Sequence, residues 1–301
     1  ARIEAMAVVT SSDATPFVWA SQILPKKVEW LWPHRIPIGK MTTFAGPGGI
    51  GKTFVLCDIA ARVSSGAEWP LCGGETAEPG NVLFISGEDD EDDTLVPRLI
   101  ECGADLDRIA FLSPQVHDHF TLAALELLSS LIDRITDVRL VVIDPPTTYL
   151  GDVDSHKDAE LRGAILGPLK RWAAKYRVAV ILNTHVNKAS APNVDAAARV
   201  MGSVAWVNAV RTAHMFIRDK DDPDKVLFVP FKVNITKRRP ALSYKVAETR
   251  DELARIEWLG EIDTTADEAL NKDVRKAGTR SAKEVLIEMF SERREWPGDL
   301  F

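Results

Sequence analysis

The sequence has few cysteines, no long hydrophobic run and no leader-like segment. Its three cysteines, Cys57, Cys72 and Cys102, form no CxxC pair, which argues against a zinc site and a disulfide framework and favours a reducing compartment. No run of about 18 apolar residues occurs, so we expect no membrane span and no membrane partner. Residues 1–17 lack the charged and apolar regions of a signal peptide. We therefore expect a cytoplasmic protein.

Positive charge is also not in excess. The chain has 44 Asp and Glu against 37 Lys and Arg, which gives a formal net charge of −7. Binding of duplex DNA over the whole outer surface needs a broad basic footprint, so the charge balance argues against that mode. Contact through a local basic patch or channel stays open. With 301 residues, 46% of them hydrophobic, the chain can bury a sizeable core.

Short apolar runs alternate with helical stretches through the first two thirds of the chain. The run Leu140–Ile143 is uninterrupted, as in strands buried on both faces of a parallel sheet. This alternation predicts an α/β fold, a mostly parallel sheet flanked by helices. The other predicted strands are Met41–Ala45, Asn81–Ser86, Ile109–Ser113 and Val178–Leu182, and the predicted helices are Thr53–Val63, Thr94–Cys102, Leu122–Ile135 and Asp158–Tyr176.

Strands follow strands after a short helix near Ser203–Val210, which predicts an antiparallel extension at one edge of the sheet. We expect an N-terminal arm over residues 1–25, the α/β domain over 26–260 and a helical C-terminal tail over 261–301. The best helix of the tail is Ala282–Phe290. The strands predicted for the extension are His214–Arg218, Val226–Phe231, Leu242–Val246 and Ala254–Trp258.

One glycine-rich segment matches GxxxxGK[ST] in full. A predicted strand precedes it and a predicted helix follows, as this phosphate-binding loop requires. Glycines let backbone N–H groups turn toward phosphate oxygens, and the helix directs its positive end at the same anion. Lys52 would reach the β- and γ-phosphates and the Thr53 hydroxyl would bind Mg²⁺. The alternative is a chance glycine-rich turn. The segment is Gly46, Pro47, Gly48, Gly49, Ile50, Gly51, Lys52 and Thr53.

Two acidic residues follow predicted strands. Asp144 ends the strand RLVVID, where ligands bind in open α/β sheets, and it could hold Mg²⁺ through water opposite Thr53. The alternative is that it caps the turn at Pro145. Glu88 follows the strand NVLFIS, and we predict that it activates water for hydrolysis, with Asp89 second. The alternative is a solvated acidic run over residues 88–93, whose later members suit a helix N-terminus.

The strand VAVIL leads into a polar end with His185. A polar group there could hydrogen-bond the γ-phosphate and report its loss to the segment that follows. The alternative is a histidine bonded to backbone. Asn187–Met201 is long and rich in small residues, which is typical of functional or mobile loops, although a plain surface loop is also open.

Basic residues follow the short helix near Ser203–Val210 and cluster in one strand-turn region of the predicted extension. Arg211, Lys232 and the triplet Lys237–Arg239 could complete a neighbouring subunit's ATP site or contact nucleic-acid phosphates. A solvated hairpin tip is the alternative for the triplet. Trp30 and Trp32 could stack on bases, but packing against the sheet is favoured.

Together these residues resemble the RecA-like ATPases of the hexameric replicative helicase group, in particular the RepA-type helicases of plasmids, phages and mobile elements. The resemblance extends from about Trp30 to Val246. It is carried by the segments WLWPHRIPIGKMTTFAGPGGIGKT, NVLFISGEDDEDDTLVPRL, LVVIDPPTTYL, ILNTHVNK, GSVAWVNAVRTAHMFIRD and FVPFKVNITKRRPALSYKV. In the family motif that contains histidine, two histidines are often adjacent, whereas here Thr184 precedes His185.

The resemblance implies a RecA-like P-loop NTPase core that hydrolyses ATP with Mg²⁺ in a ring, expected to be a hexamer. It implies single-stranded DNA in a central channel, 5′-to-3′ translocation, and a primase or initiator protein as a further partner. It also leads us to expect a C-terminal module of which 261–301 is only the start. The alternatives are a regulatory or recombination ATPase that does not unwind DNA, and a nucleotide-switched replication scaffold. The matching residues are Lys52 and Thr53 of the P-loop, Asp144 as the Walker B acid, Glu88 as the catalytic glutamate, His185 as the sensor, and Arg211 as the arginine finger, with Lys232 as a weaker candidate.

Overall fold

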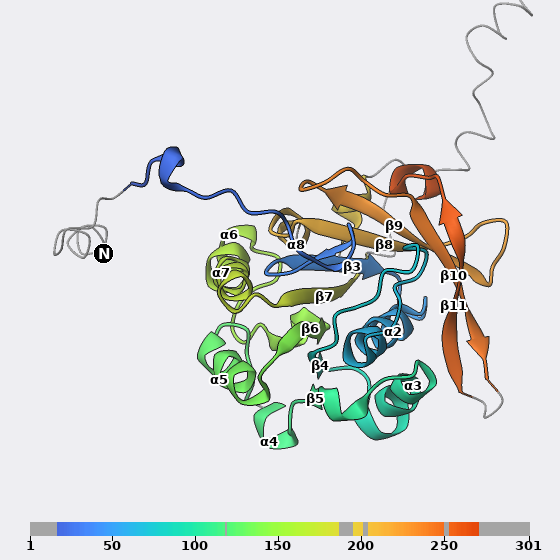
Figure 1. Ribbon diagram of the computed structural model, residues 1–301, viewed down its shortest axis with the longest axis horizontal. Coiled ribbons are helices and arrows are strands. Elements are labelled where there is room, and N and C mark those ends of the chain that lie inside the picture. Colours follow the sequence, from blue (N-terminus) through green and yellow to red (C-terminus); the bar gives the residue numbers. More distant parts are fainter. Residues whose placement is uncertain (1–16, 118, 187–194, 201–203, 250–252, 271–301) are drawn as a thin grey trace, which may run out of the picture.

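A mixed sheet forms the centre of the molecule in the computed structural model, which describes residues 17–117, 119–186, 195–200, 204–249 and 253–270 (Figure 1). Within these residues the order of the nine strands is β11-β10-β9-β8-β3-β7-β6-β4-β5. The strands are β3 (Met41–Gly46), β4 (Asn81–Ser86), β5 (Ile109–Phe111), β6 (Val138–Asp144), β7 (Ala179–His185), β8 (Thr212–Arg218), β9 (Lys225–Val233), β10 (Ala241–Glu248) and β11 (Ala254–Ile262).

The strands from β5 across to β8 pair in parallel, and β8, β9, β10 and β11 pair antiparallel. This confirms the predicted α/β fold with a mostly parallel sheet and an antiparallel extension at one edge. The P-loop strand β3 lies between β7 and β8, so both of its edges are covered. A separate pair, β1 (Trp30–Trp32) and β2 (Ile36–Pro37), precedes it.

Helices cover both faces of the sheet (Figure 1). On one face, α2 and α3 bury Val55 and Leu99 in one hydrophobic cluster. On the other, α5 and α7 bury Leu128 and Trp172 in a second cluster. The helices are α2 (Lys52–Ser65), α3 (Val96–Glu101), α4 (Pro114–His117), α5 (Leu125–Ile135), α6 (Asp158–Leu161), α7 (Gly167–Tyr176) and α8 (Ala205–Asn208).

Two predicted helices contain a π turn. The helix expected at Asp158–Tyr176 is α6, the π turn Arg162–Leu166 and α7. The helix expected at Thr94–Cys102 begins earlier, with the π turn Glu91–Leu95 before α3. In both, a proline stands two residues after the π turn, and because proline has no N–H it cannot continue the regular helical bonding.

Three other predicted ends were wrong by three or four residues, and one of them is the end of β11, which runs to Ile262 and not to Trp258. Strand β7 continues through His185 because its last residues pair with Phe44, Ala45 and Gly46 of β3. Helix α5 begins only at Leu125, since the N–H of Leu122 donates to the carbonyl of Tyr149 at 2.7 Å. The difference at β7 matters for the site, because it places His185 beside the P-loop.

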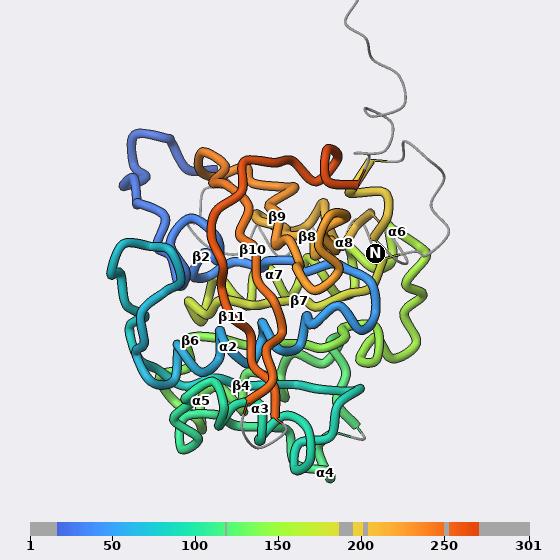
Figure 2. Tube along the Cα trace, turned by 90° about the vertical axis from the view of Figure 1, so that its right-hand side faces the viewer, coloured from blue at the N-terminus to red at the C-terminus, as the bar shows by residue number. Residues whose placement is uncertain are grey.

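The hairpin of β10 and β11 does not continue flat along the sheet. Figure 2 shows it crossing α2 toward α3, and β11 contacts both helices. Trp32 lies under this hairpin, fully buried and stacked on Trp69 and Phe228 at 5.2 and 5.7 Å between ring centroids. The favoured packing role is therefore confirmed for Trp32.

The two predicted end segments are only partly described. The arm is described from residue 17, where the 3₁₀ turn Ala20–Gln22 lies away from the sheet (Figure 1). The predicted helix Ala282–Phe290 lies outside the described residues. In the part of the chain that the structure describes, no helix is long and apolar enough to cross a membrane.

Candidate active site

The loop between β3 and α2 has an open inner side and a packed outer side. Gly49 and Gly51 have φ angles of +69° and +89°, a region that favours glycine. A Cβ built on Gly48 or Gly49 would meet nothing within 4 Å, whereas one on Gly46 would lie 2.8 Å from Cβ of Phe216. The space over the loop therefore fits an anionic group cradled by backbone, as expected of a P-loop.

The antiparallel extension supports this loop from outside. The Tyr244 hydroxyl, on β10, donates to the Ile50 carbonyl at 3.1 Å. A Cβ on Gly51 would lie 3.2 Å from Cγ2 of Val246. Strand β10 thus fixes the loop just before α2 begins. Burial raises the pKa of Tyr244, so its hydroxyl keeps the proton that it donates.

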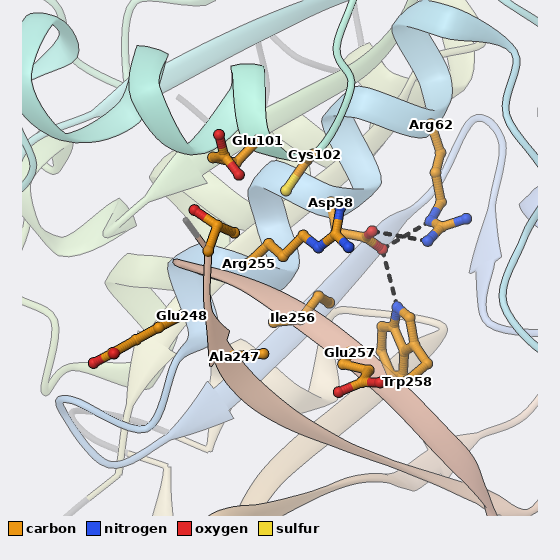
Figure 3. A pocket seen from close by; sticks show the side chains of 11 residues that line it. Asp58, Arg62, Glu101, Cys102, Ala247, Glu248, Arg255, Ile256, Glu257 and Trp258 are labelled. Carbon is orange, nitrogen blue, oxygen red and sulfur yellow. Dashed lines mark hydrogen bonds and ion pairs between the residues drawn. The ribbon is translucent and has the colours of Figure 1, made fainter. Parts of the chain in front are cut away.

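Helix α2 is held by the same hairpin farther along. Asp58 accepts two hydrogen bonds from Arg62, both at 2.8 Å, and one from Nε1 of Trp258 at 3.1 Å (Figure 3). These residues lie in a groove of about 990 Å³ between α2, α3 and the hairpin. The groove lies along α2 beyond the P-loop and has acidic and basic side chains together, including Glu101 and Arg255. We assign it a structural role in attaching the hairpin.

Lys52 points into the loop. Its side chain is 5% exposed, and Nζ donates to the carbonyls of Gly46 and Pro47 at 3.1 and 2.9 Å. Burial lowers the pKa of Lys52, while the carboxylates of Asp144 and Glu88 oppose this shift. A triphosphate would offer the ammonium group charged oxygens in place of neutral carbonyls.

Thr53 and Asp144 form the second part of the site. The Thr53 hydroxyl donates to Oδ2 of Asp144 at 3.3 Å, and Nδ2 of Asn183 donates to Oδ1 at 2.6 Å. Burial raises the pKa of Asp144 to about 6, although the bond from Asn183 lowers it. Among the described residues no cationic group forms an ion pair with Asp144, and a hydroxyl beside such a buried carboxylate is a donor set that fits Mg²⁺. The metal role of both residues stays a prediction.

Asn183 was missed as a site residue by sequence reasoning. It lies on β7 beside Asp144 of β6, and its Oδ1 is buried without a hydrogen-bond partner among the described residues. The signal was available in the sequence, since an amide directly after a fully apolar strand lies where it can be buried, and a buried amide usually has a polar partner.

Replacing Asp144 by Asn should change stability in a pH-dependent way. Because the folded pKa is about 6 against an ordinary value of 3.8, this carboxyl group favours the fold when protonated, and that contribution is lost as pH rises through 4 to 6. We expect Asp144→Asn to raise the free energy of unfolding of the nucleotide-free protein at pH 7.5 by up to about 3 kcal/mol. The gain should be roughly half as large at pH 5.

Thermal unfolding at both pH values, with and without Mg²⁺ and ATP, measures this effect. The variant should also lose most of the rise in Tm that Mg²⁺–ATP gives the wild type. Equal Tm gains at pH 5 and 7.5 would contradict the assignment of a buried, ionised Asp144.

Glu88 and His185 meet above Lys52. Oε1 of Glu88 lies 3.3 Å from Nε2 of His185, and Nδ1 of the same ring lies 3.4 Å from Nζ of Lys52. The structure thus connects the predicted water activator, the predicted sensor and the P-loop lysine through two successive side-chain contacts. His185 contacts side chains here, so the alternative of a histidine bonded to backbone is not what is seen.

Asp89 differs from Glu88 in its partners. Its carboxylate accepts from Arg98 at 3.3 Å, and its backbone exchanges two bonds with the Ser86 hydroxyl at 3.0 and 3.2 Å. Glu88 is 52% exposed and faces the P-loop side. The acidic run therefore divides into Glu88 at the site, Asp89 in the turn, and a helical part from Glu91 onward. This geometry favours Glu88 over Asp89 for the predicted role.

Arg211 lies at the amino-terminal ends of the parallel strands, whereas the P-loop of the same chain lies at their carboxyl ends. Its N–H donates to the carbonyl of Met41, the first residue of β3, whereas the P-loop follows Gly46 at the far end. At about 3.3 Å per residue, the two ends of β3 are about 17 Å apart. The structure therefore does not bring Arg211 together with the other predicted site residues within one subunit.

The other basic candidates also lie near the amino-terminal ends of the parallel strands. Nζ of Lys232 donates to the carbonyls of Val207 and Asn208 at 2.8 and 3.1 Å, so it caps the end of α8. The triplet Lys237–Arg239 is exposed between β9 and β10, in agreement with a solvated hairpin tip and available to an anionic partner.

The segment after His185 is only partly described. Residues 187–194 and 201 lie outside the described residues, but 195–200 contain the 3₁₀ turn Ala196–Arg199. Ala196 is buried, and its N–H donates to Oδ1 of Asp267 at 3.1 Å. Residues 195–200 thus have a turn of their own and pack on the body of the domain, and the functional or mobile role predicted for the whole segment stays a prediction.

A P-loop between a central parallel strand and a helix, with an acidic residue at the end of a nearby strand, defines a P-loop nucleoside triphosphatase. The profile of a family described as AAA domain matches residues 9–191. The chain therefore belongs to this family and is a P-loop ATPase. No curated protein matches it.

Proposed function

We propose that this chain is an ATP-hydrolysing motor that moves on single-stranded DNA, a RepA-like replicative helicase that works as a hexamer. The observation that carries the proposal is the line of contacts from Lys52 through His185 to Glu88. His185 lies directly before the segment 187–201, which corresponds to the DNA-contacting loop of the helicases that this chain resembles. A change at the γ-phosphate would therefore reach that segment through a single side chain.

The chemistry of hydrolysis follows from the same residues. Bound ATP would supply the γ-phosphate, and Mg²⁺ would supply positive charge that neutralises the negative charge developing in the transition state. Lys52 and the backbone of the loop would hold the phosphates, and Thr53 and Asp144 would hold the metal. Glu88 would orient the attacking water and take its proton, with His185 at 3.3 Å fixing the carboxylate.

Glu88→Gln tests the role of the carboxylate. An amide keeps the size and a hydrogen-bonding oxygen but cannot accept the proton, so we expect kcat for ATP to fall by roughly 10²-fold to 10³-fold. Equilibrium binding of a fluorescent ATP analogue should stay within about twofold, since Glu88 is not part of the phosphate cradle. Asp89→Asn is the matched control and should keep most of the turnover. A larger loss in Asp89→Asn than in Glu88→Gln would reverse the assignment.

The first experiment on the function is steady-state ATP hydrolysis with and without single-stranded DNA, with Lys52→Ala as the blank. Strong stimulation by DNA supports a motor and leads to a strand-displacement assay with 5′ and 3′ tails. Turnover that ignores DNA points to the regulatory or recombination ATPase. Assembly that depends on ATP, with almost no turnover, points to the replication scaffold.

A further inference from the structure

His117 is the one histidine outside the P-loop site that touches the turn carrying Glu88, as far as the chain is described. It ends α4, and its Nε2 lies 2.8 Å from the carbonyl oxygen of Ser86, the last residue of β4. A carbonyl oxygen only accepts, so Nε2 must carry the proton and donate it. The ring therefore holds the strand end from which the turn 86–89 begins.

The same nitrogen also contacts the segment that follows Asp144. Nε2 of His117 lies 2.9 Å from the hydroxyl of Tyr149, which is 2% exposed, and the two rings meet edge to face at 5.5 Å. Tyr149 ends the short turn Pro146–Tyr149 after β6. His117 is thus a shared contact of the two segments that carry the predicted water activator and the predicted metal ligand.

The turn is fixed at its other points, which leaves few ways for it to move. The N–H of Gly87 donates to the carbonyl of Asp144 at 2.8 Å, and a Cβ on Gly87 would lie 2.8 Å from Cγ2 of Thr148. Asp89 is tied to Arg98 of α3. A small hollow of about 240 Å³ lies between this turn and His117, lined by residues 86–91, Leu112, Pro114 and His117. Without the His117 bond, the Ser86 carbonyl could tilt into that space.

We propose that His117 is a positioning residue for Glu88. It holds the turn 86–89 in a fixed position relative to the segment from Asp144 to Tyr149. The proposal rests on the proposed function for the role of Glu88. Small displacements of a catalytic group cost large factors in rate. The side-chain contacts of His117 that the described residues show go to Ser86 and Tyr149 and not to residues 46–53, so its loss should act on kcat and leave nucleotide binding intact.

Two variants separate positioning from bulk packing. His117→Gln keeps a side-chain N–H donor that can reach the position of Nε2, and His117→Leu removes the donor but keeps an apolar side chain of similar volume. We expect His117→Leu to lower kcat by roughly 10-fold to 100-fold with an unchanged KM for ATP, and His117→Gln to restore most of kcat. His119→Leu, exposed and two residues away, is the matched control and should behave like the wild type.

Hydrogen–deuterium exchange of the peptide spanning residues 86–93 provides a readout that does not need turnover. Exchange should be faster in His117→Leu and close to wild type in His117→Gln. Unchanged exchange in His117→Leu overturns the inference, even if the protein does not hydrolyse ATP. If kcat and Tm fall together in both His117 variants, the inference is also overturned, because such a result indicates that His117 acts through packing. Absence of wild-type turnover above Lys52→Ala would instead reject the proposed function.

Discussion

Lys52→Ala is expected to reduce ATP turnover by at least about 10³-fold, to the level of a blank without protein. In the structure the ammonium group is nearly fully buried in the loop and lies 3.4 Å from His185. It would face both the γ-phosphate and the residue proposed to sense it. Loss of this charge removes stabilisation of the phosphate oxygens when charge shifts toward the leaving group. Steady-state phosphate release measures the effect.

The control for this variant is Lys170→Ala, an exposed lysine on α7. It should keep wild-type turnover. The Tm of Lys52→Ala without nucleotide should stay close to that of the wild type, because burial already disfavours the charged form of Lys52. Normal turnover in Lys52→Ala would reject the site assignment.

Arg211→Ala is expected to lower kcat by roughly 10³-fold while sparing the affinity for ATP. The reason is geometric: Arg211 lies at the start of β3 and the P-loop lies at its end, so the guanidinium can reach a γ-phosphate only on another subunit. A fluorescent ATP analogue measures the affinity, and phosphate release measures kcat. Arg134→Ala, exposed on α5, is the control.

A mixing experiment separates a contribution in trans from a structural one. Lys52→Ala and Arg211→Ala should each be almost inactive alone. In the proposed ring, however, a mixture of the two has interfaces with an intact P-loop on one side and an intact Arg211 on the other. Turnover should therefore reappear on mixing and reach a maximum near equal amounts. No recovery, in a mixture shown to co-assemble, would remove the finger role of Arg211.

Local sequence patterns predicted most of the candidate site residues that lie at the carboxyl ends of the parallel strands. The P-loop and the strand ends that carry Asp144 and His185 follow from spacing and from the rule that the carboxyl ends of parallel strands meet at one edge. The structure confirms that these residues lie together. The sequence could not decide whether Glu88 or Asp89 is the water activator, because the two acidic residues are adjacent in one acidic run. The choice depends on Arg98, nine residues on, which engages Asp89.

Contacts between distant segments could not be predicted from the sequence. The bond from Tyr244 to Ile50 joins residues 194 apart, and the bond from Trp258 to Asp58 joins residues 200 apart. Both depend on the twist that carries the β10–β11 hairpin across α2. Periodicity describes which residues form a strand, but not which helix that strand will cover.

The position of β3 between β7 and β8 has a consequence for how the chain divides into modules. The family match ends at residue 191, before β8 begins. A fragment that stops there would turn β3 into an edge strand, uncover Phe44 where Phe216 and Phe228 now pack, and deprive the P-loop of Tyr244. The segment matched by the family profile therefore lacks strands against which its own P-loop strand packs, and we expect it not to fold by itself. Its phosphate-binding loop packs against Tyr244 and Val246, which lie 53 and 55 residues beyond the end of the family match at residue 191, so grafting or trimming this ATPase has to retain β8–β11.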